Sequence, residues 1–518
     1  MVQPQAAEFD IPLRSGEVVC LPSAEEFRGL AEENAAALAA SPFQLSGHPL
    51  AEVRRQTRRW VLSAASAFSK ALGLSTSLPR EDALLYVTGH QPFLFHPGVW
   101  IKQLLVGRMV GKGIGGLSMP VDSDTFEELG VDVPEFVDGL RLTRETLLRA
   151  GPDIPYEVHP RPSETEWRTF LDRVEAHLRT LSLGGVQQVF SRFKQQVVDL
   201  DSTTNLGTFL TAVRRRHEGS RPYLEVPVSR LGESPEFRQF FLHILADAAR
   251  FADCYNRHLE TYRTRNNIRT PAQPFPNLEI DRERVELPFW LLHQGRRRPC
   301  YAQPRAGGWQ VWAGEEPVRI VPRGEPAHAL DGLAIRPRAL TLTAFTRLCV
   351  ADLFIHGVGG GRYDRATDEV IREYFGIQPP RYAVVTATLH LPLAEFNTNT
   401  ERRELQRRLL ELRHNPDRVL VTPSTREREL IDEKWRLIAA LEAGTITRRE
   451  RRETTQRIRE INDLLTHALE AERRLTEQRL ADLGTSQAEV AATYRGYPFC
   501  FFAPSAIDEL VSSVLPDR

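Results

Sequence analysis

Most of the side chains in this sequence that are suited to chemistry lie in one stretch, TGHQPFLFHPGVWIK at residues 88–102. It holds two histidines, His90 and His96, and a lysine, Lys102, which falls in the first turns of a predicted helix. Imidazole and ammonium groups can stabilise negative charge that develops during attack at a phosphoryl or acyl centre. Only five lysines occur among the 67 basic residues, so a lysine here is more informative than an arginine would be. Either histidine alone could be structural, but the three side chains together favour a site.

A second candidate is the glycine-rich run GVGGG at 357–361. It follows the strand-like segment DLFIH, which ends at His356, and precedes the helix-like segment RYDRATDEVIREYFG. Glycines at such a junction allow backbone N–H groups at the positive end of a helix to approach an anion. The run therefore predicts an anion site, and the alternative is a tight turn that binds nothing beside an ordinary packed histidine.

A third candidate is the acidic segment DSDTFEEL at 122–129, which closes a predicted strand. Its carboxylates belong to Asp122, Asp124, Glu127 and Glu128. Carboxylates at the edge of a sheet could hold Mg²⁺ or the ammonium group of an amino-acid substrate. The alternative is an acidic first turn that stabilises the start of a helix.

Other familiar motifs are absent or stand in the wrong context. GKGIGG at 111–116 matches G-x-G-x-x-G, but a helix precedes it and a strand follows, so it predicts a connector and not a nucleotide site. The five cysteines form no Cys-x-x-Cys pair, and no His-x-x-x-His sequence occurs. We therefore expect neither a zinc site nor metal-dependent hydrolysis. No G-x-S-x-G nucleophile motif occurs either.

The elements around the first candidate predict a parallel α/β sheet. LLYVTG at 84–89 is strand-like, VWIKQLLVGRMV at 99–110 has helical periodicity, and GLSMPVD at 116–122 is strand-like again. In such sheets, ligands gather at the carboxyl ends of the strands. The loops that follow Thr88 and Val121 should therefore share one edge.

The rest of the chain alternates between helical and strand-like segments. Helices are expected over 24–74 and over most of 140–285, and further strands at 224–228, 352–356 and 382–392. Four short strands between 285 and 325 predict an antiparallel meander. Beyond about 395 the composition shifts to Arg, Glu and Leu, with breaks only at HNPD (414–417) and AGT (443–445). Three long helices follow from that pattern, either as a protruding dimeric coiled coil or folded back on their own core.

Length and charge limit the classes of function. A chain of 518 residues should contain about three packing units. The formal net charge of −1 predicts no general affinity for nucleic acid or for anionic membranes. We find no signal-like start and no apolar run of membrane-spanning length, and the odd cysteine count does not suggest a disulfide framework. A cytoplasmic protein is expected.

Four segments, taken in order, resemble the cysteine ligases of bacillithiol biosynthesis, also called cysteine-adding enzymes. TGHQPFLFHPGVW resembles the family's T-G-Q-Q-x-G-L-F-T-G-P-L-Y loop, and DSDTFEEL resembles its E-D-H-D-F-E-E-I. IRPRALTLT at 335–343 and LFIHGVGGGRYD at 353–364 resemble its N-x-x-L-R-P-L-x-Q and Y-V-G-G-P-G-E-I-A-Y. ELPFWLL at 286–292 is similar to the family's small β insertion, and the Arg/Glu helices are similar to its dimerising coiled coil.

The resemblance implies an α/β fold with a Rossmann-type parallel sheet core. That core would cover residues 1–395, with insertions at about 140–205 and 283–328. An antiparallel helical coiled coil would follow over 396–485 and form a homodimer, and residues 486–518 would pack back on the core.

The resemblance also implies a ligase that joins the carboxylate of cysteine to the amine of glucosaminyl malate. Amide formation needs an activated acyl group and a neutral amine, so ATP or another nucleotide is expected, with Mg²⁺ as a further candidate. The catalytic residues would be His90, Gln91, His96 and Lys102, and substrate would bind Asp122, Asp124, Glu127 and Arg336. The cofactor would bind Gly89, His356, Gly357, Gly359, Gly360 and Gly361. Two alternatives stay open: a non-catalytic dimeric binding or scaffold protein, and a nucleotidyltransferase-like enzyme for another substrate.

Overall fold

The computed structural model describes residues 11–515, apart from residues 76, 182–183, 201–204, 267, 269–274, 325, 394–399, 421, 443–447 and 483–486. The chain forms two compact units. The core unit comprises Met1–Phe136, Thr143–Leu391 and Tyr494–Arg518, and the helical unit comprises Val137–Leu142 and Pro392–Thr493.

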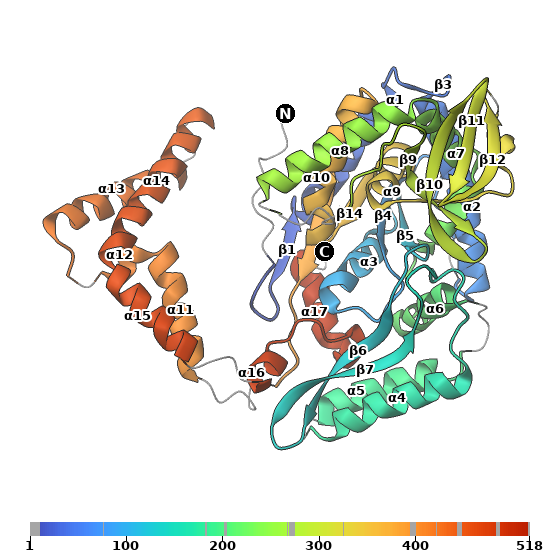
Figure 1. The fold of residues 1–518 in the computed structure, drawn as a ribbon. Coiled ribbons are helices and arrows are strands. Elements are labelled where there is room, and N and C mark those ends of the chain that lie inside the picture. Colours follow the sequence, from blue (N-terminus) through green and yellow to red (C-terminus); the bar gives the residue numbers. More distant parts are fainter. Residues whose placement is uncertain are drawn as a thin grey trace. The chain divides into compact units, whose positions relative to one another are not determined.

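A six-stranded sheet is the centre of the core unit (Figure 1). Four neighbouring pairs are parallel, and only the edge strand β1 runs antiparallel to its neighbour. The predicted strands at 84–89, 116–122 and 352–356 all belong to it, which confirms a mixed α/β fold with parallel strands. In order across the sheet, the strands are β1 (Val18–Leu21), β15 (Ala383–Ala387), β14 (Leu353–His356), β4 (Leu84–His90), β5 (Ile114–Pro120) and β8 (Leu224–Glu225).

Two crossover connections leave the middle of this sheet in opposite directions. From β4 the chain passes through helix α3 (Pro97–Met109) to β5 on one side. From β14, the neighbour of β4, it passes through helix α10 (Val358–Tyr374) to β15 on the other side. Ligand crevices form at such points, because the loops that follow the two adjacent strands diverge there. As expected, GKGIGG connects α3 to β5.

A second, antiparallel sheet packs within the core unit and contains the predicted meander. Apolar side chains at alternate positions of its strands, such as Leu287, Phe289 and Leu291, join the main hydrophobic core. In order across the sheet they are β12 (Glu316–Pro322), β11 (Gly308–Ala313), β10 (Arg296–Arg305), β9 (Val285–His293) and β13 (Ala334–Pro337).

Helices surround both sheets, and phenylalanines hold them together. Phe240 lies with its ring centroid 5.3 Å from Phe345 and 5.6 Å from Phe375, which joins three helical segments that are distant in sequence. The helices of the core unit, besides α3 and α10, are α1 (Phe27–Ala39), α2 (Leu50–Ala71), α4 (Glu164–Arg179), α5 (Gly184–Val197), α6 (Leu206–Glu218), α7 (Pro235–Ala246), α8 (Ala248–Arg265), α9 (Ala339–Phe345) and α17 (Pro504–Val514).

One segment that we expected to be helical is a strand. β6 (Glu128–Phe136) and β7 (Leu140–Arg149) pair as a two-stranded sheet. LRLTRETLLR belongs to the region 140–285 that we expected to be mostly helical, but most of its residues are half-buried, as in a two-stranded ribbon with both faces partly exposed. The acidic segment is likewise no helix start, since β6 begins at Glu128.

The helical unit contains more breaks than the sequence suggested, so the prediction of three long helices is wrong. The break near Asn415 is observed, AGT at 443–445 lies outside the described residues, and a further break falls between Ala468 and Glu470. Two small apolar clusters pack within the unit, one around Leu412 and Leu469 and one around Leu430 and Ile461. Its helices are α11 (Thr400–His414), α12 (Pro416–Val419), α13 (Thr425–Glu442), α14 (Arg448–Ala468), α15 (Glu470–Asp482) and α16 (Gln487–Ala492).

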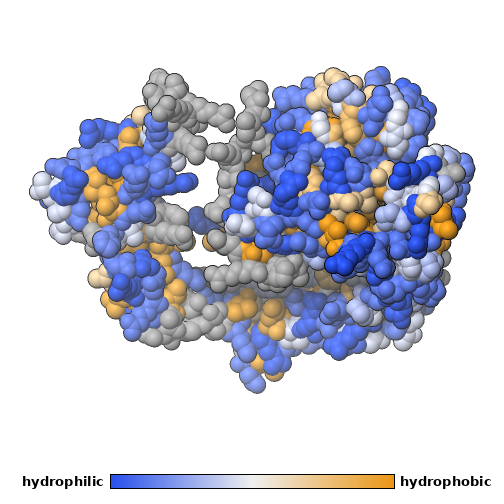
Figure 2. All heavy atoms as spheres, turned by 45° about the horizontal axis from the view of Figure 1, so that its top comes forward, coloured by the Kyte–Doolittle hydropathy of each residue, from blue (hydrophilic) through white to orange (hydrophobic). Residues whose placement is uncertain are grey.

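Among the described helices, none combines the length and the apolar character that crossing a membrane requires. The face of the molecule drawn in Figure 2 is mostly hydrophilic, with scattered hydrophobic side chains.

Candidate functional site

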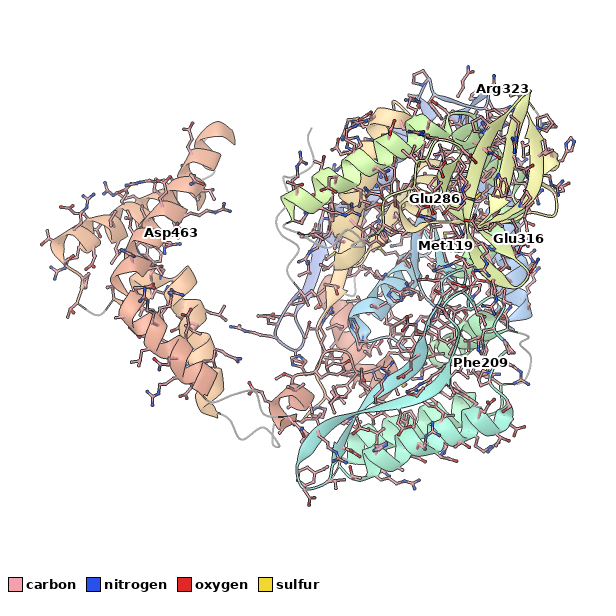
Figure 3. The ribbon with its side chains drawn as sticks, viewed as in Figure 1. Met119, Phe209, Glu286, Glu316, Arg323 and Asp463 are labelled. Atoms are coloured by element: carbon pink, nitrogen blue, oxygen red, sulfur yellow. The ribbon has the colours of Figure 1, made fainter. Side chains whose placement is uncertain are left out.

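A cavity of about 590 Å³ lies in the core unit at the carboxyl ends of β4, β5, β14 and β15. The loop after β4 and the glycine-rich start of α10 both line it, so the two strongest sequence candidates face one space. Met119 of β5 contributes to the cavity wall, and Figure 3 marks its position together with Glu286 of β9.

His96 caps the helix that carries the lysine. It is the N-cap residue of α3, and its Nδ1 accepts a hydrogen bond from the Gly98 N–H at 3.1 Å. Nδ1 must therefore be unprotonated. Burial, reinforced by the positive charges of Arg495 and Lys102, lowers the pKa of His96 to about 3. A neutral His96 then carries its proton on Nε2.

The glycine that His96 caps permits close packing of α3 on the sheet. A Cβ atom on Gly98 would lie 2.1 Å from the carbonyl oxygen of Ala387 in β15. Thr386 Oγ1 donates to the Gly98 carbonyl at 3.1 Å. The Pro97-Gly98 pair thus fixes the position at which the first turn of α3 meets the cavity.

His90 ends β4 and is partly open to the cavity. Its Nδ1 lies 3.2 Å from the Gln91 carbonyl oxygen, which can only accept, so Nδ1 carries the proton. Burial and then the Lys102 charge lower the pKa of His90 to about 3. Both imidazoles are therefore neutral near pH 7, and Nε2 of His90 keeps its lone pair.

Lys102 is a buried cation without a carboxylate partner. Its side chain is only 3% exposed, and Nζ donates to the Gly89 carbonyl at 3.1 Å. It forms no ion pair with a carboxylate of the described residues, and burial lowers its pKa to about 8. Burying an ammonium without a counter-charge is costly, so its place in a cavity wall indicates a site for an anion.

Arg495 brings a second positive charge that lacks a carboxylate partner among the described residues. Its Nη2 donates to Thr386 Oγ1 at 2.6 Å and to the Ala387 carbonyl at 2.8 Å, and Nε donates to Thr388 Oγ1 at 2.8 Å. These acceptors are all neutral, and burial lowers the pKa of Arg495. Two cations thus border the cavity from opposite ends of the sequence.

The start of α10 completes the positive side of the cavity. Gly357 is the N-cap residue, no side chain caps the helix, and a Cβ on Gly357 would lie 4.0 Å from Lys102 Nζ. A Cβ on Gly359 would meet no atom within 4 Å, so backbone N–H groups at this end are approachable. The helix dipole adds a partial positive charge at the same place.

His356 is fixed by the helix that follows it. Its Nε2 lies 2.9 Å from Asp364 Oδ2, and Asp364 also accepts from Arg347 at 2.6 Å and from Thr343 at 2.6 Å. Burial lowers the pKa of His356 although Asp364 opposes that effect. The ring lines the cavity in one held orientation.

Asp124, on the acidic side of the cavity, already has a side-chain hydrogen-bond partner on each carboxylate oxygen. Asp124 accepts from Gln91 Nε2 at 2.9 Å and from Arg297 at 2.7 Å. Arg297 stacks 4.6 Å from the Trp290 ring centroid, and Arg338 lies 3.9 Å from the same ring. Arg338 is in turn paired with Glu286. Asp124 and Gln91 therefore form one hydrogen-bonded wall beside an aromatic side chain.

Four of the predicted site residues do not line the cavity. Asp122 accepts from the Ser229 N–H at 2.8 Å and from its hydroxyl at 2.6 Å, and burial raises the pKa of Asp122 to about 7. Arg336 makes a two-point ion pair with Glu157, at 2.8 and 2.7 Å. Glu127 is exposed, and a Cβ on Gly361 would lie 2.4 Å from Val384. Each of these residues holds the fold together or faces solvent.

The structure therefore does not bring the acidic segment together as a Mg²⁺ site. Glu128, the remaining carboxylate of that segment, pairs with Arg144 and Arg149. Among the described residues, the single group of three ligand-type side chains that converge is Cys254, His258 and Glu373, away from the cavity lining.

Several cavity residues escaped sequence analysis. Arg495 is one arginine among many and lies far along the chain from the others, and nothing in its local sequence marked it. Trp290, Arg297 and Arg338 come from the second sheet and the segment that follows it. ELPFWLL contained Trp290, IRPR contained Arg338, and Arg297 lies between these two segments, but only the tertiary contact of the two sheets brings the three side chains to the cavity.

No protein-family model and no curated protein matches this chain.

Proposed function

We propose that the cavity binds the anionic groups of a nucleotide and of a carboxylate substrate, and that the protein is an ATP-dependent carboxylate–amine ligase. The supporting observation is Lys102, a buried cation without a carboxylate partner in the described chain, directed at the uncapped start of α10. The two neutral histidines and Arg495 border the same space. The order of the four sequence segments supports a relation to the cysteine-adding enzymes.

The proposed reaction is a transfer in two steps. The carboxylate oxygen attacks the γ-phosphorus of ATP and displaces ADP, which gives an acyl phosphate, or it attacks the α-phosphorus and displaces pyrophosphate, which gives an acyl adenylate. The amine nitrogen then attacks the acyl carbon, a C–N bond forms, the phosphate or nucleotide leaves with the C–O bonding pair, and the amine loses a proton. Lys102, Arg495 and the α10 N–H groups would stabilise charge on the phosphoryl oxygens.

The histidines fit two different parts of this scheme. His96 can donate from Nε2 because its Nδ1 is held by the Gly98 N–H. His90 can accept at Nε2 because its Nδ1 proton is directed at the Gln91 carbonyl. A bound anion would raise the pKa of His90, so His90 is our candidate for taking the proton of the amine.

The proposed substrates are cysteine and glucosaminyl malate, and Asp124 is the candidate partner for a substrate ammonium group. Mg²⁺ stays a further candidate cofactor, and no proposed step depends on it. The proposal also includes a Rossmann-type description of the core, a homodimer formed through an antiparallel coiled coil in the helical unit, and a cytoplasmic location, where ATP is available.

The test is a product assay with ATP, cysteine and glucosaminyl malate, read by mass spectrometry. We expect the amide and a stoichiometric amount of ADP or AMP. Pyrophosphate release without amide would replace the ligase by a nucleotidyltransferase, and no turnover together with no ligand-induced thermal shift would indicate a scaffold.

Substitutions of His90, His96 and Lys102 test the roles proposed for these side chains. His90→Ala and Lys102→Met should each lower turnover by about 10²-fold or more. Lys70→Met is the matched control, because Lys70 is exposed at the end of α2. Undiminished product formation by His90→Ala and His96→Ala would contradict the assignment.

A further inference from the structure

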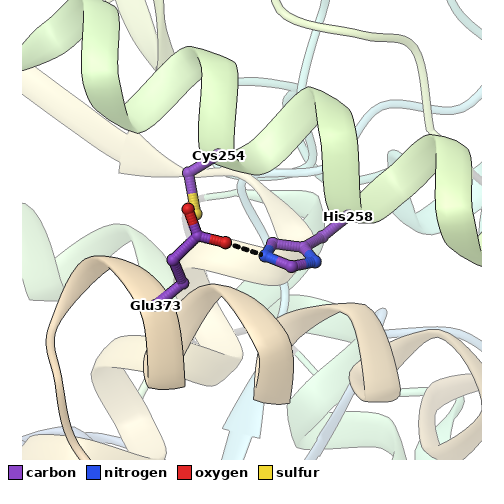
Figure 4. A group of neighbouring side chains, drawn as sticks. All are labelled: Cys254, His258 and Glu373. Carbon is purple, nitrogen blue, oxygen red and sulfur yellow. Dashed lines mark hydrogen bonds and ion pairs between the residues drawn. The ribbon is translucent and has the colours of Figure 1, made fainter.

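Three side chains of different chemistry converge between helices α8 and α10, outside the cavity (Figure 4). Cys254 and His258 lie one turn apart on α8, a spacing that places both on the same helix face. Glu373 reaches them from the penultimate residue of α10. One sulfur, one imidazole nitrogen and one carboxylate oxygen all lie within 4.8 Å of one another.

We propose that Cys254, His258 and Glu373 form a zinc-binding site with an open fourth position. Thiolate, imidazole and carboxylate are the three side-chain ligands that zinc uses in proteins, and a thiolate disfavours Mg²⁺ and Ca²⁺. Three protein ligands and a water molecule are a common zinc coordination.

The geometry needs only small adjustments. Ligand atoms around a tetrahedral zinc, at about 2.0–2.3 Å from the metal, lie roughly 3.3–3.8 Å apart. The hydrogen bond between His258 Nε2 and Glu373 Oε2, at 2.7 Å, would open, and the sulfur would move closer. Glu373 is 42% exposed and can rotate, whereas Cys254 is buried at 2% exposure and sets the position of the metal.

Cys254 would bind zinc as a thiolate. Burial, with the Glu373 carboxylate, raises the pKa of the Cys254 thiol to about 11. Zinc binding would therefore displace the thiol proton, and the balanced step is Zn²⁺ plus Cys–SH giving Zn–S–Cys plus H⁺.

Two arginines near the site, Arg257 and Arg250, oppose zinc binding because they carry charge of the same sign. Arg257 holds both oxygens of Glu373, at 2.8 and 2.7 Å, and Arg250 lies on the same helix near Cys254. Arg257 is 56% exposed, so its guanidinium can leave Oε2 for solvent while it keeps Oε1. In the absence of zinc, the same side chains form the Arg257–Glu373–His258 ion-pair cluster.

The three side chains do not line the cavity, and a metal bound there would act on the fold. Glu373 lies sixteen positions after Gly357, about 24 Å along the helix. A bound zinc would link the end of α10 to α8 and so fasten the helix whose other end lines the cavity.

Zinc titration of the metal-free full-length protein tests the proposal. We expect one zinc per chain at micromolar free metal, a higher melting temperature with zinc, and a thiolate charge-transfer band with Co²⁺ in its place. Cys254→Ser and His258→Gln should weaken zinc binding by at least about 100-fold, and Cys20→Ser and His48→Gln should leave it unchanged.

Arg257→Gln separates a metal site from a purely structural ion-pair cluster. This variant removes the competing cation and should tighten zinc binding, whereas it should destabilise a cluster that exists only for its ion pairs. Absence of binding at micromolar zinc, or binding that survives in both Cys254→Ser and His258→Gln, would overturn the proposal. The Co²⁺ spectrum of the unmodified protein decides the ligand type even if a variant fails to fold.

Discussion

Lys102 is the residue on which the proposed anion site depends most. Burial of its charge in the cavity wall lowers the stability of the folded protein. Its pKa of about 8 lies below the ordinary value of 10.5. As the pH is lowered, the Lys102 side chain is protonated near pH 10.5 in the unfolded chain but only near pH 8 in the folded protein. The free energy of unfolding therefore decreases as the pH falls from about 10.5 to about 8. Below about pH 8 the buried charge of Lys102 lowers the free energy of unfolding by on the order of 3 kcal/mol, at 1.36 kcal/mol for each unit of pKa shift. A bound anion would offset it.

Replacement of Lys102 by methionine should therefore stabilise the ligand-free protein and abolish anion binding. We expect a higher melting temperature at pH 7 without ligand, and no further shift when ATP is added. Lys70→Met should behave like the unmodified protein in both respects. A variant that loses stability, or that still responds to ATP, would contradict the role of Lys102.

The pH dependence of anion binding follows from the same group. Affinity should fall as pH rises through about 8, because Lys102 loses its charge there, and a bound anion should move this midpoint upward. Calorimetric titrations with ATP between pH 6.5 and pH 9.5 measure the effect. Affinity that stays constant across this interval would show that the anion does not contact Lys102.

At the scale of elements, α3 and α10 start beside the same cavity because β4 and β14 are adjacent parallel strands. Gly359 and Gly361 of α10 differ in the space that surrounds them. Gly359 faces open space, whereas a Cβ on Gly361 would lie 2.4 Å from Val384 of β15.

Gly361→Ala should destabilise the core by roughly 1–3 kcal/mol, because a methyl group has no room against β15. Gly359→Ala should change the free energy of unfolding by less than about 1 kcal/mol, since alanine is tolerated in a first helical turn. Chemical denaturation of both variants compares them. Equal destabilisation would mean that the packing of α10 on β15 differs from the structure described.

The sequence predicted these elements better than it predicted which polar side chains meet. Continuous apolar runs identified β4, β5 and β14, because strands of a parallel sheet are buried on both faces. Loop order then placed His90, His96 and the glycines at one edge. Asp122 and Arg336 were expected at the site but satisfy Ser229 and Glu157, partners that only tertiary packing supplies. Arg495 was missed for the same reason.

At the scale of the whole molecule, the helical unit leaves large apolar side chains exposed although it buries small clusters of its own. Leu464 and Leu475 are 52% and 60% exposed on α14 and α15. Such residues on long polar helices are typical of a surface that pairs with another chain.

If a homodimer forms through these helices, Leu464→Glu with Leu475→Glu should weaken it by at least about tenfold per residue. Analytical ultracentrifugation measures the change, and Leu78→Glu in the core unit is the control for an equally exposed leucine. A dimer that is unaffected by the double substitution would place the subunit contact elsewhere, and a monomeric unmodified protein would remove this part of the proposal.

The most direct test of the central claim is a crystal structure with a non-hydrolysable ATP analogue. We expect phosphate oxygens within hydrogen-bond distance of Lys102 Nζ and of the backbone N–H groups of Gly359 and Gly360, between the loop at 88–102 and the start of α10. An analogue bound at another place on the molecule, with this cavity left to water, would contradict the account.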